Sequence, residues 1–288
     1  MRNRVFPGAV LFVRHQGHLL FHEAVGSLSF LPDSPPVRRD TLYDLASLTK
    51  PLATASAVLL LVQDGSIDLE VPLDSLLNDS ENHSLGVRTV RDLLCHQSGL
   101  PALQPYYLDF PPDPPRDLDE YRQRCAAVLE KILNESLDET LPQKSVYSDL
   151  GFILLGFLVE RVTGQTLAEF CQSRIFDPLQ AAPLGFNPGS GQLKEAVQAE
   201  IAPTEQDPWR GRLLQGEVHD DNAFALGGMA GHAGLFGTAE AVGRITQAWL
   251  EGYHGKPGIF DPQLVKRFVT AQPGTSWALG WDTHSQPS

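Results

Sequence analysis

Residues 47–50 read Ser-Leu-Thr-Lys, and a proline follows at position 51. Side chains three residues apart share one face of a helix, so the Ser47 hydroxyl and the Lys50 amine can meet without long-range folding. Proline is tolerated only in the first turn of a helix, so this helix begins within a few residues upstream of Pro51. Ser47 is therefore predicted at the N-terminal end of the helix, where free N–H groups and the helix dipole favour negative charge.

The stretch after Pro51 predicts a buried scaffold. Residues 52–62 are apolar almost throughout, which is typical of a helix packed on several sides, and Gly65 is a suitable residue to end it. A reactive pair at the end of a rigid central helix is favourable for preorganised chemistry. The motif alone fits an ordinary N-cap with a solvated lysine equally well.

Length, charge and cysteine content limit the domain number and the kinds of function that the chain can have. A chain of 288 residues is long enough for one large domain or two closely packed subdomains. The net charge of −13 argues against nucleic-acid binding, which favours a basic surface. Cys95, Cys125 and Cys171 are widely spaced and odd in number, so free buried thiols are expected.

The N-terminal region carries no predicted targeting segment. Its apolar stretch, residues 8–13, is too short for the hydrophobic part of a signal peptide and ends at Arg14 without a cleavage pattern. No segment is expected to span a bilayer. A cytoplasmic location is expected, and a periplasmic or secreted location stays open if a leader has been removed.

Hydrophobic periodicity predicts a hairpin followed by helices. Residues 8–25 form two strands around a glycine-bearing turn. The predicted helices share amphipathic or buried patterns and N-cap residues, and they span residues 89–96, 117–133, 148–162, 166–176, 238–250 and 261–271. Residues 277–281 are expected to begin another strand. Because two strands alone are marginally stable, further sheet strands are expected beyond Ser288.

A second motif, Tyr147-Ser148-Asp149, opens the predicted helix at 148–162. Ser148 or Asp149 suits the N-cap position, which leaves the Tyr147 phenol free to point into a cleft. A phenol beside a serine and a lysine can relay protons. Taken alone, Tyr147 fits an amphipathic packing residue better.

The two motifs together resemble the serine β-lactamase and penicillin-binding-protein superfamily, on its class C and esterase side. Further landmarks follow in order over nearly the whole chain, at residues 43–46, 64–69, 93–101, 151–156, 227–235 and 279–281. The resemblance implies an α/β fold in which an antiparallel sheet packs with helices beside a mostly helical subdomain. The sheet part is expected from residues 1–65 and 235–288 and the helical part from 66–234, forming one catalytic domain.

The resemblance also implies an acyl-enzyme mechanism. Ser47 attacks a carbonyl group, and Lys50 and Tyr147 share the general-base and proton-return roles, whose division is disputed in this superfamily. The Ser47 backbone N–H serves as one oxyanion donor. Esters, β-lactams or D-amino-acid peptides are the expected substrates, and no cofactor or metal is expected.

Two departures from the superfamily pattern concern the substrate-binding residues. Asp149 replaces the usual Asn or Ser of the second motif, so its acceptor-only side chain is expected to favour esters or peptides over β-lactams. The segment from His232 to Gly234 superficially fits the third motif, but it matches better the glycine-rich loop before the helix at 238–250. Asp149, His232 and Gly234 are therefore candidate substrate-binding residues, with the third motif expected beyond Ser288.

Other polar clusters carry weaker signals. The hairpin histidines His15, His18 and His22 lack carboxylates at ligand spacing, so a metal site is not expected. The segment containing Asp220 fits a polar turn better than a cleft-lining role.

If the third motif is absent, the alternative function is a non-catalytic family member or fragment that acts as a binding or structural unit. The substrate and the oligomeric state are left open by the sequence.

Overall fold

The computed structural model describes residues 5–77, 84–138, 145–186, 193 and 201–284. One helical rod runs through its centre, and it begins with the serine–lysine motif. The rod consists of a 3-10 turn, η1 (Ala46–Leu48), a π-helical stretch, η2 (Lys50–Ala55), and α1 (Ser56–Gln63). Pro51 lies near the start of η2, and nearly every apolar side chain from Leu52 to Leu61 is buried, as the sequence predicts.

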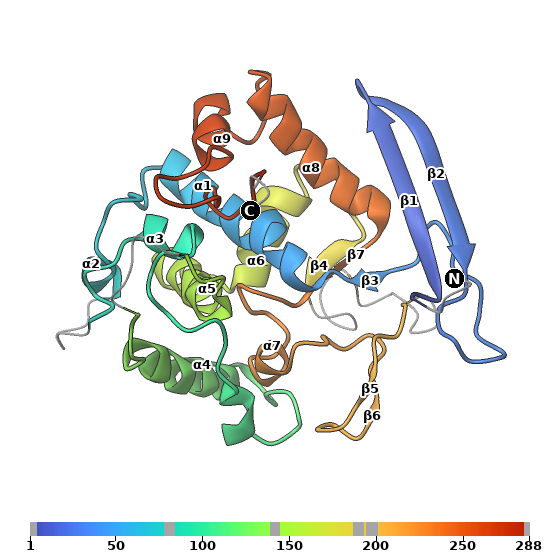
Figure 1. The fold of residues 1–288 in the computed structure, drawn as a ribbon, viewed down its shortest axis with the longest axis horizontal. Helices are drawn as coiled ribbons and strands as arrows, with labels where there is room; N and C mark the ends of the chain where they lie inside the picture. Colours follow the sequence, from blue (N-terminus) through green and yellow to red (C-terminus); the bar gives the residue numbers. More distant parts are fainter. Residues whose placement is uncertain (1–4, 78–83, 139–144, 187–192, 194–200, 285–288) are drawn as a thin grey trace.

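Helices enclose this rod on opposite sides (Figure 1). α5 (Asp149–Thr163) packs against η2 and α1 on one side, and α8 (Ala239–Tyr253) and α9 (Pro262–Phe268) pack on the other. α6 (Leu167–Cys171) continues into η4 (Gln172–Phe176), which contacts α1. α5 lies between the rod and the outer helices, so it is covered on several sides. Its side chains are therefore buried around almost the whole helix from Leu150 to Val159, with no polar face.

The helices that lie farther from the rod are shorter or more amphipathic. They are α2 (Leu73–Leu77), α3 (Val90–Leu94), η3 (Tyr106–Asp109), α4 (Leu118–Leu133) and α7 (Asp221–Ala225). Side-chain caps set where several helices begin: Thr89 forms a capping box with Asp92, and Asp117 and Thr238 each accept a bond from a backbone N–H. The six predicted helices are all confirmed, with boundaries shifted by a few residues.

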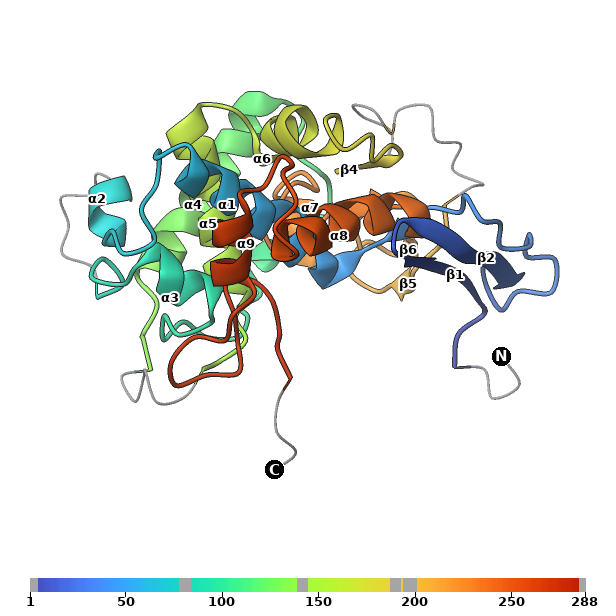
Figure 2. The ribbon, with the colours of Figure 1, turned by 90° about the horizontal axis from the view of Figure 1, so that it is seen from above.

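The strands form small antiparallel sheets. β1 (Gly8–His15) and β2 (His18–Gly26) make the predicted hairpin, which lies beside α8 (Figure 2). β3 (Tyr43–Asp44), β7 (Leu235–Gly237) and β4 (Leu184–Phe186) pair in the order β3-β7-β4, and β5 (Gln206–Asp207) pairs with β6 (Arg212–Leu213). The fold is thus α/β with antiparallel sheets and helices, as the resemblance implied. The division into a sheet part and a helical part stays a prediction.

The strand predicted at residues 277–281 is wrong. In this segment only an isolated bridge joins Trp277 to Asp282, and Gly280 has a φ of +85°. The Gly280 N–H donates to Leu94 O at 2.9 Å, and the Leu279 N–H donates to Phe268 O at 2.9 Å. The segment therefore forms a turn that caps the ends of α3 and α9, because a left-handed residue interrupts the extended backbone.

The central rod also has the length and apolar character of a membrane-crossing helix. Among the described residues, Ala46–Gln63 is the one continuous helix that is long and apolar enough to cross a membrane. α5 reaches this length only when it is counted together with the α6–η4 helix, from which it is bent by 75°. Since 67% of Ala46–Gln63 is buried inside the protein, its apolar character is that of a core helix. The expected absence of a membrane span stays a prediction.

Candidate active site

Ser47 and Lys50 face each other at the start of the central rod. Lys50 Nζ lies 3.0 Å from Ser47 Oγ, and it also donates to Asp149 Oδ1 at 2.7 Å and to His232 O at 3.3 Å. The lysine is 2% exposed, whereas Ser47 is exposed. Three acceptors around one ammonium group fix its position, so a buried amine is held against an accessible hydroxyl.

A strained turn presents Ser47. Ala46 has a φ of +46°, in the left-handed region that disfavours a side chain. Asp44 holds this turn, because its carboxylate accepts the N–H of Ala46 at 2.8 Å and that of His219 at 2.7 Å. Burial raises the pKa of Asp44, although the two N–H donors oppose the rise. Among the described residues, the Ser47 N–H has no protein acceptor, so it is available to an incoming oxyanion.

The turn is anchored to the three-stranded sheet behind it. The Thr49 hydroxyl donates to Ala46 O at 2.7 Å and accepts the N–H of Leu235 at 3.1 Å. The Leu45 N–H donates to Leu235 O at 2.9 Å, which extends the pairing of β3 with β7. Thr49 thus ties the residue before the serine to β7.

Asp149 reaches the site from the first turn of α5. Ser148 is the N-cap residue and accepts the N–H of Gly151, so the sequence leaves Asp149 free to turn towards Lys50. Their ion pair joins a 3% exposed lysine side chain to an aspartate side chain that is 25% exposed. The carboxylate at this position therefore holds the lysine, in addition to any contact with a substrate.

Tyr147 lies against an aromatic cluster beside Lys50. Its ring centroid is 4.8 Å from Lys50 Nζ, 4.6 Å from the His96 ring and 5.4 Å from the Trp277 ring. Within the described part of the chain, the Tyr147 hydroxyl has no hydrogen-bond partner, and the side chain is 39% exposed. The structure therefore brings the Tyr147 ring to Lys50, whereas Asp149 accepts a hydrogen bond from the amine.

His96 packs against Tyr147 as a neutral imidazole. Its Nδ1 accepts the Ser148 N–H at 3.1 Å, which requires an unprotonated nitrogen. Burial, together with the charge on Lys50, lowers the pKa of His96 to about 3. The ring therefore stays uncharged, and it packs between Tyr147, Phe152 and Trp277.

His232 contributes its backbone to the site, while its side chain is turned to Asp220. The imidazole is 1% exposed, its Nε2 lies 2.8 Å from Asp220 Oδ1, and its Nδ1 has no hydrogen-bond partner among the residues that the structure describes. Burial favours the neutral form of Asp220, but the charge and hydrogen bond of His232 prevail and hold the pKa of this aspartate below its usual range. Gly234 has a φ of +116°, and a Cβ there would lie 2.2 Å from Gly228 O, so it serves a close backbone turn.

Comparison with known proteins places this geometry in a family. A family model described as Beta-lactamase matches residues 1–287. The chain belongs to the Beta-lactamase family. It is 33% identical over 307 residues to the N-acetylmuramyl-L-alanine amidase of Bacillus subtilis (strain 168), with 98% of this chain and 68% of that relative covered.

Two further likenesses extend across nearly the whole chain. A protein of Escherichia coli O157:H7, provisionally named a D-alanyl-D-alanine carboxypeptidase, is 33% identical, with 96% of this chain and 68% of that relative covered. The octameric penicillin-binding protein homologue from Pyrococcus abyssi has a TM-score of 0.74 at 21% identity, which shows the shared fold; 97% of this chain and 61% of that one are covered. This Beta-lactamase family chain thus spans about two thirds of its curated relatives and a smaller share of that structure.

The site draws on residues that the sequence motifs did not identify. Asp220 was expected in a polar turn, and it does cap α7, but it also pairs with His232. The available signal for Asp44 was its position directly before the serine turn, and the signal for His96 was its position in a family landmark, residues 93–101. The three cysteines are free, as expected, but only Cys95 and Cys171 are buried, and Cys125 is half-buried. Over the described residues, no group of three or more His, Cys, Asp or Glu side chains is arranged to hold a metal ion.

Proposed function

We propose that this Beta-lactamase family chain is a serine hydrolase that works through an acyl-enzyme. The observation that carries the proposal is the 3.0 Å contact between Lys50 Nζ and Ser47 Oγ, in which the amine is buried and the hydroxyl is accessible. A nucleophile within hydrogen-bond reach of a base that a third group orients is the arrangement expected for covalent catalysis. Asp149 is the orienting group in this case.

The proposed reaction has two halves. Lys50 acts in this step as the neutral amine, which has a lone pair free to accept a proton. Ser47 Oγ attacks the substrate carbonyl carbon while its proton passes to Lys50 Nζ, and the Ser47 N–H donates to the developing oxyanion. Lys50 then returns the proton to the leaving group as the bond to the carbonyl carbon breaks. Water then attacks the carbonyl carbon of the resulting ester and passes a proton through Lys50 to Ser47 Oγ. The bond from the carbonyl carbon to Ser47 Oγ breaks, which releases the acid and restores the serine. Tyr147 is the proposed partner in the proton transfers, for which its hydroxyl, without a hydrogen-bond partner among the described residues, has to turn towards Lys50, because only the ring lies against the amine.

Amides next to a D-amino acid, followed by esters, are the proposed substrates. The names of two relatives, an amidase and a provisional D-alanyl-D-alanine carboxypeptidase, support an amide bond. The carboxylate of Asp149 favours peptides and esters over β-lactams, because it accepts but cannot donate a hydrogen bond and is already committed to Lys50.

A fluorophosphonate probe tests the proposal on the whole chain. Intact-mass spectrometry and peptide mapping should find one covalent adduct on Ser47. Ser47→Ala should abolish the adduct, while the matched control Ser75→Ala, at an exposed serine on α2, should label like the wild type. A folded wild-type sample that takes up no label contradicts the proposal and favours a non-catalytic binding unit.

A further inference from the structure

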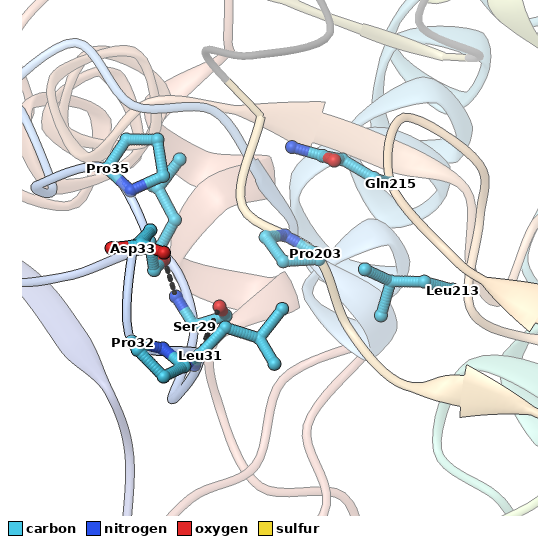
Figure 3. Close-up of a pocket in the computed structure, with 10 residues that line it drawn as sticks. Ser29, Leu31, Pro32, Asp33, Pro35, Pro203, Leu213 and Gln215 are labelled. Atoms are coloured by element: carbon cyan, nitrogen blue, oxygen red, sulfur yellow. Dashed lines mark hydrogen bonds between the residues drawn. The ribbon is translucent and has the colours of Figure 1, made fainter.

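A cavity of about 430 Å³ lies apart from the serine site, and none of its lining residues belongs to that site. One wall is the proline-rich loop after β2. The other wall contains Pro203 and Leu213, which are distant in sequence from that loop (Figure 3). Volumes of this order accommodate small ligands. The cavity is therefore large enough to be a binding site in its own right.

The loop wall is held in shape without a ligand. The Leu28 N–H donates to Pro35 O at 2.8 Å, and the Ser29 N–H donates to Ser34 Oγ at 2.8 Å (Figure 3). Pro32 and Pro35 restrict the loop backbone further, because their rings fix φ. A wall that is already ordered costs little conformational entropy when a ligand binds.

The second wall is tied to the body of the protein. The Ala202 N–H donates to Leu42 O at 2.8 Å, and the Thr204 N–H donates to Leu214 O at 3.0 Å. The Gln215 side-chain amide donates to Ile201 O at 2.8 Å. The first of these bonds connects the wall to the segment leading into β3, and the other two join the two segments of the wall to each other. Hydrogen bonds therefore hold both sides of the cavity.

The lining has a distinct chemistry. Leu31 and Leu213 are 64% and 42% exposed, so folding leaves apolar surface uncovered at this cavity. Asp33 carries the single formal charge among the lining residues, and in the described part of the chain it has no ion-pair partner. We propose that this cavity binds a small ligand that combines an apolar body with one ammonium group.

Calorimetric titration of the whole chain with hexylammonium tests the proposal, and hexanoate is the matched anionic probe. Leucine methyl NMR locates the site through Leu31 and Leu213. Hexylammonium is expected to bind about tenfold more tightly than hexanoate, because Asp33 attracts one probe and repels the other. Equal affinities, or no shifts at these two leucines, overturn the proposal.

Two substitutions separate the apolar and the charged contributions. Leu213→Ala should weaken hexylammonium binding about tenfold through lost apolar contact, while Leu250→Ala, at an exposed leucine of α8, should not change it. Asp33→Asn should weaken hexylammonium binding about threefold. The matched control is Asp119→Asn, at an exposed aspartate of α4, which should leave the affinity unchanged. Unchanged affinity in Leu213→Ala or in Asp33→Asn overturns the proposal.

The competing occupant of the apolar surface is a second copy of the chain. Sedimentation velocity on the wild type and Leu213→Ala measures this directly. The small-ligand proposal is overturned if the wild type is a dimer that does not bind hexylammonium and Leu213→Ala is a monomer. Fluorophosphonate labelling of Ser47 is expected to be unchanged in Leu213→Ala, which keeps this test independent of the proposed hydrolase activity.

Discussion

Single residues at the site have sharply different surroundings although they lie close together. Lys50 is buried with three acceptors, whereas Ser47 is open to solvent within 3.0 Å of it. Ala46 carries a left-handed backbone that Asp44 holds in place. Such strain is kept where it aims a functional group, and here it presents the serine hydroxyl outward.

The buried neutral His96 makes stability depend on pH. Its pKa, lowered from 6.5 to about 3, means that the unfolded chain takes up a proton at this position more readily than the folded chain. The stabilising contribution is therefore fully present above pH 6.5 and is lost as the pH falls towards 3. Asparagine tolerates the φ of +58° at this position and retains an acceptor.

His96→Asn is expected to flatten this dependence. Between pH 7 and pH 4, the free energy of unfolding should fall by on the order of 2 kcal/mol more in the wild type than in the variant. Urea denaturation at both pH values gives the difference. If the free energy of unfolding falls equally in the two proteins, the pKa of His96 is not lowered in the folded state and the prediction is wrong.

At the scale of elements, the loop before β7 fits tightly against α5 and the rod. A Cβ on Gly231 would lie 2.0 Å from Phe152 O, and the Gly231 carbonyl accepts the Thr54 hydroxyl at 2.6 Å. The next carbonyl, that of His232, accepts from Lys50. Close backbone packing between a loop and a helix thus places one of the acceptors of the lysine.

Gly231→Ala is expected to destabilise the fold by about 1–3 kcal/mol through overpacking and to reduce Ser47 labelling by moving the His232 carbonyl. Chemical denaturation and labelling kinetics measure the two effects. Gly258→Ala is the matched control, because a Cβ there meets nothing within 4 Å. Equal stabilities of the two variants would contradict the packing argument.

At the scale of the whole molecule, Trp249 connects the rod to the C-terminal helices. Its indole N–H donates to Ser56 Oγ at 3.0 Å, and its ring lies 5.2 Å from Phe260, 6.2 Å from Phe268 and 5.1 Å from Trp281. The ring therefore joins α8 to α1, α9 and the turn near the chain end. Support for the serine–lysine pair depends on contacts made by segments about 200 residues away, such as this one.

Trp249→Ala is expected to lower the free energy of unfolding by about 3–5 kcal/mol, since it leaves a cavity and removes the bond from the indole N–H to Ser56 Oγ. Tyr253→Ala, at an exposed aromatic residue on the same helix, should cost much less. Thermal and urea unfolding followed by circular dichroism compare the two variants. A small loss in Trp249→Ala would mean that the rod is stable without these contacts.

The sequence predicts local structure and the core of the site better than the long-range contacts. The hairpin, the helices and the Ser47–Lys50 contact follow from periodicity, caps and an i,i+3 spacing, which are all local. The turn at Gly280 was predicted as a strand because the partner of its N–H, the Leu94 carbonyl, is remote in sequence. The pairing of His232 with Asp220 depends equally on tertiary packing, which no local pattern encodes.

The central claim is that the Lys50 amine activates Ser47, and the rate of fluorophosphonate labelling of Ser47 in Lys50→Met measures it most directly. A positioned base typically contributes about 10²–10⁴-fold, so labelling should slow by at least about 100-fold while circular dichroism shows a folded protein. A folded Lys50→Met protein that labels at the wild-type rate would contradict the claim.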